Sequence, residues 1–310
     1  MVFRKDEQID HIIARCEGAY SPITLRGYRN DLVQFQTWCR DHGQPWLPAS
    51  PTAIAAFVDD QAKSMTIATV KRRVEAIKFA HRLSDLPSPA GNSQVLLALR
   101  RAGRAKRRRP NQALGLTTCM LEKMVAACPD TLAGLRDAAL VSVGYDTLCR
   151  SSELAAMRVE HLSENLSTIC IPRSKADPFG DGRIAWLSPA TIERLSAWLD
   201  ASELTEGPLF QGLHTAKLSH MALDTSSIRR LVKRAAARAN LGQTAIQGLS
   251  GHSMRVGAAQ DMMVAGIDAI GIMQAGGWRT FHVLARYVEN ASAELMHQKR
   301  WRRLASLTTT

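Results

Sequence analysis

Several features that would restrict the class of this protein are missing from its sequence. No apolar run reaches membrane-spanning length, and no charged and then apolar signal opens the chain. The 6 cysteines are scattered without a C-x-x-C pair, which argues against a zinc site and is typical of a reducing compartment. No acidic metal cluster and no internal repeat is evident. We therefore expect a soluble, cytoplasmic protein with no metal site and no cofactor.

Negative charge is also scarce, because 28 acidic residues face 40 lysines and arginines and leave a formal net charge of +12. Such an excess of positive charge favours a polyanionic partner. The length of 310 residues suggests two domains, each large enough to bury a core.

Residues 1–105 read as a small all-helical domain. Ser21-Pro22 and Ser50-Pro51 are typical helix starts, a capping residue followed by proline in the first turn. Apolar residues recur at helical spacing over 25–39 and 67–83, with basic residues off those stripes. These basic faces could enter a DNA major groove. The candidate DNA-binding residues here are Arg26, Arg29, Lys71, Arg72, Arg73 and Arg101.

A dense block of like charge follows and includes Arg107 and Arg108. Such a block repels itself unless it meets phosphate, so we interpret 106–112 as a linker laid along DNA.

Residues 113–310 form the second expected domain, of α+β type. Segments 167–172 and 183–188 carry strand formers, and the Pro- and Gly-containing turn between them predicts a β-hairpin with Lys175 at its turn end. A helix over 225–239 presents Arg229 and Arg230 as further DNA-binding candidates. The tail, from about residue 294, is an amphipathic helix candidate. The expected fold is mainly α with a small antiparallel β-sheet.

The stretch 249–290 contains the most informative pattern. His252 and Arg255 lie three residues apart at the start of a predicted helix, and therefore on one face of it. An imidazole and a guanidinium near a helix N-terminus make a good anion site. Taken alone, His252 could be a structural residue, and Trp278 and Tyr287 could be core residues. The case therefore depends on order and spacing across the chain.

That larger pattern closely resembles the tyrosine recombinase (phage integrase) family. The residues that carry the resemblance are Arg150 and Glu153 in TLCRSSELAAM, Lys175 in PRSKADP, His252 and Arg255 in GHSMRVGAA, Trp278 in MQAGGW, and Tyr287 in ARYVEN. The resemblance covers roughly residues 20–290. Many relatives have histidine where this chain has Trp278.

The resemblance implies a site-specific recombinase that closes as a clamp around double-stranded DNA with inverted-repeat sites. It would act as a dimer on each site and a homotetramer on two paired sites, with the tail helix exchanged between subunits. It would be nucleoid-associated and encoded by a bacterium, phage or plasmid. DNA would be cut and rejoined through a covalent 3′-phosphotyrosine, without metal or ATP.

The same resemblance gives each residue a role. Tyr287 would be the nucleophile, with its proton accepted by His252. Arg150 and Arg255 would bind the non-bridging phosphate oxygens. Lys175 would protonate the leaving 5′ oxygen, Trp278 would donate its indole N–H to phosphate and support Tyr287, and Glu153 would orient the histidine or an arginine.

Two alternatives stay open from the sequence. A type IB topoisomerase or a telomere-resolving enzyme would share this chemistry. A non-catalytic DNA-binding regulator would need only the basic faces and would tolerate the loss of Tyr287 or Arg255.

Overall fold

The computed structural model describes residues 7–105, 112–172, 182–214, 217–291, 296–298 and 300–301. The chain divides into two units, Met1–Pro110 and Asn111–Thr310, which are taken separately below. In the described residues, no helix is long and apolar enough to cross a membrane.

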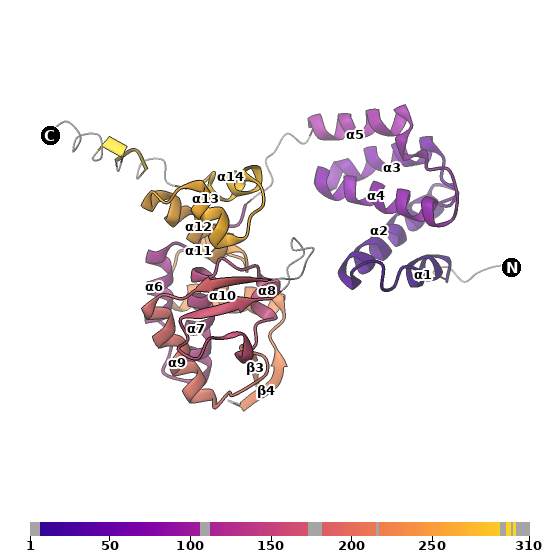
Figure 1. Ribbon diagram of the computed structural model, residues 1–310. Helices are drawn as coiled ribbons and strands as arrows, with labels where there is room; N and C mark the ends of the chain where they lie inside the picture. Colours follow the sequence, from indigo (N-terminus) through magenta and orange to yellow (C-terminus); the bar gives the residue numbers. More distant parts are fainter. Residues whose placement is uncertain are drawn as a thin grey trace. The chain divides into compact units, whose positions relative to one another are not determined.

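Capping residues set the starts of the helices in the first unit. Ser21 accepts a hydrogen bond from the backbone N–H of Thr24 at 3.2 Å, and Ser50 accepts one from Ala53 at 3.1 Å. A proline follows each of these caps at the first helical position. The elements, shown in Figure 1, are α1 (Glu7–Ala14), α2 (Pro22–Asp41), α3 (Pro51–Ser64), α4 (Ile67–Leu83), the 3-10 helix η1 (Pro89–Gly91) and α5 (Ser93–Ala105).

Aromatic side chains fill the core of this unit. Phe35 and Phe57 meet edge to face with ring centroids 5.0 Å apart, and Trp38 packs on Phe57 at 5.5 Å. His81 is fully buried, and its Nε2 accepts a hydrogen bond from the backbone N–H of Ala49 at 3.0 Å. These contacts fix α2, α3 and α4 against one another.

One expectation for this unit was wrong. Arg73 was placed with Lys71 and Arg72 on an outward basic face, but its side chain is only 12% exposed. Its guanidinium donates a hydrogen bond to Gln61 and lies 3.7 Å from Asp31. Three consecutive helical residues span more than half a turn, so they cannot all share one face.

The second unit is organised around α7 (Leu132–Asp146), which is buried from Arg136 through Gly144. Thr131 caps its start by accepting a hydrogen bond from the backbone N–H of Gly134 at 3.2 Å. The other helices are α6 (Thr118–Ala126), α8 (Ser151–Ala155), the 3-10 helix η2 (Val159–His161), α9 (Pro189–Ser202), α10 (Thr225–Arg238), α11 (Gln243–Gly248), α12 (Ser253–Ala265), α13 (Ala269–Gly276) and α14 (Phe281–Val288).

The fold is mainly α, as expected, but it contains two small antiparallel sheets where we expected one. Strand β1 (Thr168–Ile171) pairs with β2 (Arg183–Trp186), which is the predicted hairpin. A second pair, β3 (Gln211–His214) and β4 (Lys217–Ala222), was missed. Strand β4 is almost wholly exposed and the register shifts near Gln211, so the alternation of apolar and polar residues that reveals a strand is absent.

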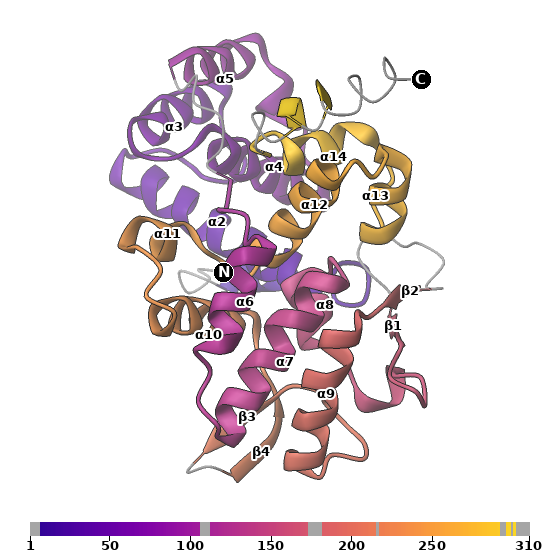
Figure 2. The same ribbon diagram turned by 90° about the vertical axis from the view of Figure 1, so that its left-hand side faces the viewer.

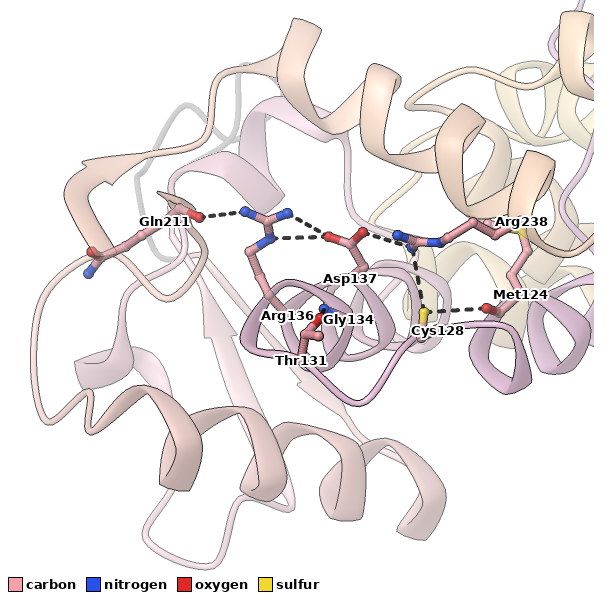
Figure 3. Close-up of polar contacts among 8 residues, drawn as sticks. All are labelled: Met124, Cys128, Thr131, Gly134, Arg136, Asp137, Gln211 and Arg238. Carbon is pink, nitrogen blue, oxygen red and sulfur yellow. Dashed lines mark hydrogen bonds and ion pairs between the residues drawn. The ribbon is translucent and has the colours of Figure 1, made fainter. Parts of the chain in front are cut away.

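A buried polar cluster joins α7 to α10 and to β3. Asp137 is 1% exposed, accepts from the Arg136 guanidinium at 2.7 Å, and forms an ion pair with Arg238 of α10 at 2.8 Å. Arg136 also donates to the backbone carbonyl of Gln211 at 3.2 Å (Figure 3). A buried carboxylate needs such partners, so this cluster fixes where α10 packs on α7.

Helices α12, α13 and α14 gather at one end of the second unit, and the β3–β4 pair lies at the other end (Figures 1 and 2). The second unit therefore has a helical end that is set apart from its exposed sheet.

Candidate active site

The turn between α7 and α8 places Arg150. Leu148 adopts a left-handed conformation with φ 48°, which turns the chain sharply after α7. Arg150 then stands at the N-cap of α8, where the Glu153 carboxylate accepts from its backbone N–H at 2.9 Å. The same carboxylate accepts from the Arg150 guanidinium. Glu153 is 7% exposed and the Arg150 side chain 30%, so a buried anchor holds a cation whose end reaches solvent.

The start of α12 places His252 and Arg255. His252 is the N-cap residue, and its backbone N–H donates to the Ser250 hydroxyl at 3.1 Å. Arg255, one turn later, is fully buried, and its Nη1 donates to the backbone carbonyl of Leu148. The long-range bond from α12 to the α7–α8 turn explains how two arginines far apart in sequence come to one place.

Arg255 lies among aromatic rings. Its guanidinium carbon is 4.1 Å from the centroid of the Trp278 ring and 5.4 Å from that of Tyr287. The two rings themselves are 4.9 Å apart. The predicted residues Arg150, Glu153, His252, Arg255, Trp278 and Tyr287 are thus brought to the helical end of this unit.

Two glycines make room for Trp278. A side chain on Gly276 would begin 2.1 Å from the Trp278 ring, which is too close for any other residue. Gly277 adopts φ +65° and ends α13, and the backbone N–H of Trp278 then donates to the carbonyl of Met273 at 2.9 Å. The Gly-Gly-Trp order in the sequence is therefore a steric requirement of this turn.

Three buried donors at the site lack a hydrogen-bond acceptor among the described residues. They are Nε and Nη2 of Arg255 and Nε1 of Trp278. Buried donors are nearly always paired in folded proteins. Together with the positive charge of the fully buried Arg255 guanidinium, they favour an anionic ligand with several oxygens.

The electrostatic environment favours neutral His252. Neighbouring protein atoms displace water around the ring, and Arg255 and Arg150 add positive charge, so the pKa of His252 is lowered from its ordinary value. Burial also lowers the pKa of Arg255, while the phenol of Tyr287 acts in the opposite direction. Arginine remains charged nonetheless, so the site combines a fixed cation with a neutral base.

Other nucleophiles near the site are held unreactive. Cys149 precedes Arg150, but burial raises the pKa of its thiol to about 11, so the thiolate is scarce at neutral pH. Tyr145 donates to the Asp261 carboxylate at 2.6 Å, and burial and that bond raise the pKa of its phenol. Tyr287 is half-buried, and its ring lies beside the Arg255 guanidinium.

Sequence reasoning missed Arg183. From β2 its guanidinium donates to the carbonyl of Ala275 at 2.8 Å and to the carbonyl of Thr147. It thereby ties the end of α13, three residues before Trp278, to the end of α7, three residues before Arg150. Only the fold brings these carbonyls together, and no motif marks them.

The candidate DNA-binding residues differ in their surroundings. Arg26, Lys71, Arg229 and Arg230 are exposed. Arg29, Arg72 and Arg101 form ion pairs with Asp10, Asp31 and Asp59 at 2.6, 2.7 and 2.6 Å. These carboxylates neutralise part of the positive charge that the three arginines would offer to phosphate. Lys175, Arg107 and Arg108 lie outside the described residues.

The fold is mainly helical, and one end of its second unit holds a buried arginine, a histidine and a tyrosine. Comparison with known protein families identifies the class to which such a fold and site belong. Residues 116–294 match the phage integrase family, and residues 13–82 match its N-terminal SAM-like domain. The chain belongs to the phage integrase family of tyrosine recombinases, enzymes that cleave and rejoin DNA in site-specific recombination.

Individual relatives agree with that assignment. The chain is 30% identical over 293 residues to an integrase/recombinase XerD homolog of Selenomonas ruminantium, covering 90% of this chain and 84% of that one. It is 29% identical over 299 residues to the recombinase Cre of Escherichia phage P1, covering 89% and 86%.

Solved structures show the same fold. The XerH site-specific recombinase bound to a palindromic difH substrate superposes with a TM-score of 0.65 at 16% identity, covering 98% of this chain and 85% of that one. A lambda integrase dimer bound to a COC′ core site gives 0.63 at 14% identity, covering 93% and 77%.

Proposed function

We propose that this chain is a site-specific DNA recombinase that cuts DNA with Tyr287. The observation that carries the proposal is the Arg255 guanidinium, buried between Trp278 and Tyr287 with donors that lack an acceptor in the described residues. A phosphodiester bound there would place a non-bridging oxygen on the cation and its phosphorus next to the phenol.

The reaction would proceed by transfer of the phosphoryl group to tyrosine. The Tyr287 oxygen attacks phosphorus while the bond to the 5′ oxygen breaks, which leaves a 3′-phosphotyrosine and a free 5′-hydroxyl. An ordinary phenol has a pKa of about 10, so it needs a base, and neutral His252 can accept its proton. Lys175 would supply a proton to the leaving oxygen.

The two arginines would stabilise the extra negative charge of the transition state. Glu153 contributes by fixing Arg150, since its carboxylate accepts from both the backbone and the guanidinium of that residue. Because the ester energy is kept in the phosphotyrosine, resealing needs no ATP, and the fixed cations take the place of metal ions.

At the level of the assembly, the two units would close as a clamp on double-stranded DNA. The relatives include recombinases solved on their recombination sites, which supports DNA with inverted-repeat sites as the partner. Two protomers on each site and four on two paired sites would complete strand exchange.

A substitution of Tyr287 by phenylalanine tests the proposal. It removes one oxygen and keeps the ring, so DNA binding should stay within about twofold because packing is retained, while cleavage disappears. The substrate is a DNA site selected from a random pool by its binding to the protein. A nick near the cleavage point lets the short fragment with the free 5′-hydroxyl diffuse away. Wild type should accumulate a covalent adduct without Mg²⁺ or ATP.

The adduct should map to the peptide containing Tyr287 and carry a 3′-phosphate. A 5′-phosphate linkage, an adduct with Tyr287→Phe or an absolute Mg²⁺ requirement would overturn the mechanism. Relaxation of supercoils without exchange between paired sites would instead indicate a topoisomerase.

A further inference from the structure

The backbone carbonyl of Tyr287 accepts two side-chain amides. Nε2 of Gln112 and Nε2 of Gln260 each donate to it at 3.2 Å. Tyr287 lies in the last turn of α14 (Phe281–Val288), where carbonyls have no partner within the helix. The two glutamines therefore cap α14 from outside, at the residue that carries the nucleophile.

Gln260 is held rigidly. It is 8% exposed and stands on α12, the helix that also carries Arg255. A side chain on Gly115 would begin 2.2 Å from its amide oxygen, so the absence of one at that position makes room for the amide. The packing leaves Gln260 little freedom to turn away from Tyr287.

Gln112 is fixed from both sides. Its amide oxygen accepts from the Asn290 side chain at 2.9 Å. The backbone that follows is bonded to the α11–α12 region, since the N–H of Leu114 donates to Gly248 at 2.9 Å and that of Leu116 to Ser253 at 2.8 Å. Gln112 thus reaches Tyr287 from a fixed segment.

Helix α14 needs such support. It has eight residues, its first residue is preceded by Thr280 without a side-chain cap bond, and only Leu284 within it is buried. A helix this short with one buried residue is weakly constrained. A small rotation of it would move the phenol away from Arg255.

We propose that Gln112 and Gln260 are positioning residues for the nucleophile, which set the height and rotation of Tyr287 relative to Arg255. This inference rests on the proposed role of Tyr287. It extends the site to residue 112. It also means that α12 both carries Arg255 and, through Gln260, holds the backbone of Tyr287.

The test compares the single-turnover rate of adduct formation on the nicked substrate. Gln112→Met and Gln260→Met keep the length of the side chain and remove the donor. Each should slow cleavage about fivefold, or about 1 kcal/mol, because the carbonyl keeps one partner. The double variant should lose about a hundredfold, more than the product of the two, because a carbonyl without any donor is costly.

Gln211→Met is the matched control. Gln211 is 2% exposed, and its amide donates to the carbonyl of Pro208 at 3.2 Å, a bond of the same kind in the same unit. It stands on β3, at the end of the unit opposite α12, α13 and α14 (Figure 1). It should lower stability without changing the cleavage rate of folded protein. Binding to a single DNA half-site should be unchanged in all these variants.

Gln260→Glu adds a readout that a merely structural role would not move. The carboxylate cannot donate to Tyr287, but the protonated acid can, so the rate relative to wild type should recover as pH falls from about 8 to about 5. Cleavage at wild-type rates in the double variant, equal losses in Gln211→Met, or no recovery would overturn the inference. If wild type forms no adduct at Tyr287, the proposed function itself has failed.

Discussion

At the scale of single residues, the site depends on cations that the fold keeps beside a neutral base. Arg255 is fully buried, with Trp278 on one side and a backbone carbonyl on another. Such a cation keeps its charge and imposes a field on its neighbours. The pKa of His252 is lowered by burial first and then by the charges of Arg255 and Arg150. A base that stays neutral near physiological pH suits proton transfer from a phenol.

His252 should therefore titrate below its ordinary pKa of 6.5 in the free protein. NMR titration of its ring protons, assigned with His252→Gln, checks this. Arg150→Met removes one nearby positive charge and should raise the pKa toward the ordinary value. A pKa at or above 6.5 in wild type, or no response to Arg150→Met, would contradict the electrostatic account.

The same shift has a consequence for stability. The folded-state pKa of His252 lies below the unfolded value, so between the two values the unfolded chain holds a proton that the folded chain does not. The contribution of His252 to stability is therefore lost as pH falls below about 6.5 and levels off below the folded-state pKa.

At the scale of elements, α7 is the central buried helix of the second unit, and α6, α9, α10 and α12 pack against it. Its end leads into the turn that delivers Arg150, and Arg183 and Arg255 bind two successive carbonyls in that turn, those of Thr147 and Leu148. Its middle carries Asp137, which fixes α10 through Arg238. The helix thus connects the candidate active site to the helix that presents Arg229 and Arg230.

Asp137→Ala should destabilise the second unit by about 3–5 kcal/mol, because it leaves Arg136 buried without a carboxylate. Arg238→Met should cost only about 1 kcal/mol, since Arg238 is partly exposed and Asp137 keeps Arg136 as a partner. Native-state hydrogen exchange of the α7 amides measures both, because it reports the opening of this unit alone. Equal costs would show that the cluster does not act as described.

At the scale of the whole molecule, the net charge and the exposed apolar side chains support the proposed assembly on DNA. The chain carries a net charge of +12, and apolar side chains remain exposed in the last part of the second unit. Ile270 and Phe281 are 69% and 62% exposed, and Trp301 in the tail is 61% exposed. Surfaces of this kind are typical of sites that bind another protein chain.

Truncation after Ser292 should therefore leave binding to a single half-site unchanged but impair assembly on two paired sites. The reason is that the tail would pack on a neighbouring protomer rather than on its own chain. Sedimentation of protein–DNA complexes on half-sites and on paired sites measures the two properties. Unchanged assembly on paired sites would show that the tail docks within its own subunit.

Much of the fold was predictable because its signals are local in the chain. Ser21-Pro22 and Ser50-Pro51 start helices as expected, and α10 (Thr225–Arg238) matches the helix expected over 225–239. Capping and apolar periodicity act over a few residues, so a sequence displays them directly. The family also followed from short motifs, whereas the catalytic roles assigned to Arg150, His252 and Tyr287 stay predictions.

What the sequence by itself determined was therefore the class of protein, most helices and the residue types of the site. Tertiary structure alone decided that Arg73 turns inward, that β3 and β4 pair, and that Arg183 joins two helix ends. It also decided that Gln112 meets the carbonyl of Tyr287, 175 positions away. Arg73 meets the side chains of Gln61 and Asp31, which lie 12 and 42 positions away in the sequence. The other contacts depend on backbone groups, which nearly every residue carries, so no side-chain pattern in the sequence can reveal which carbonyl a distant arginine or glutamine will bind.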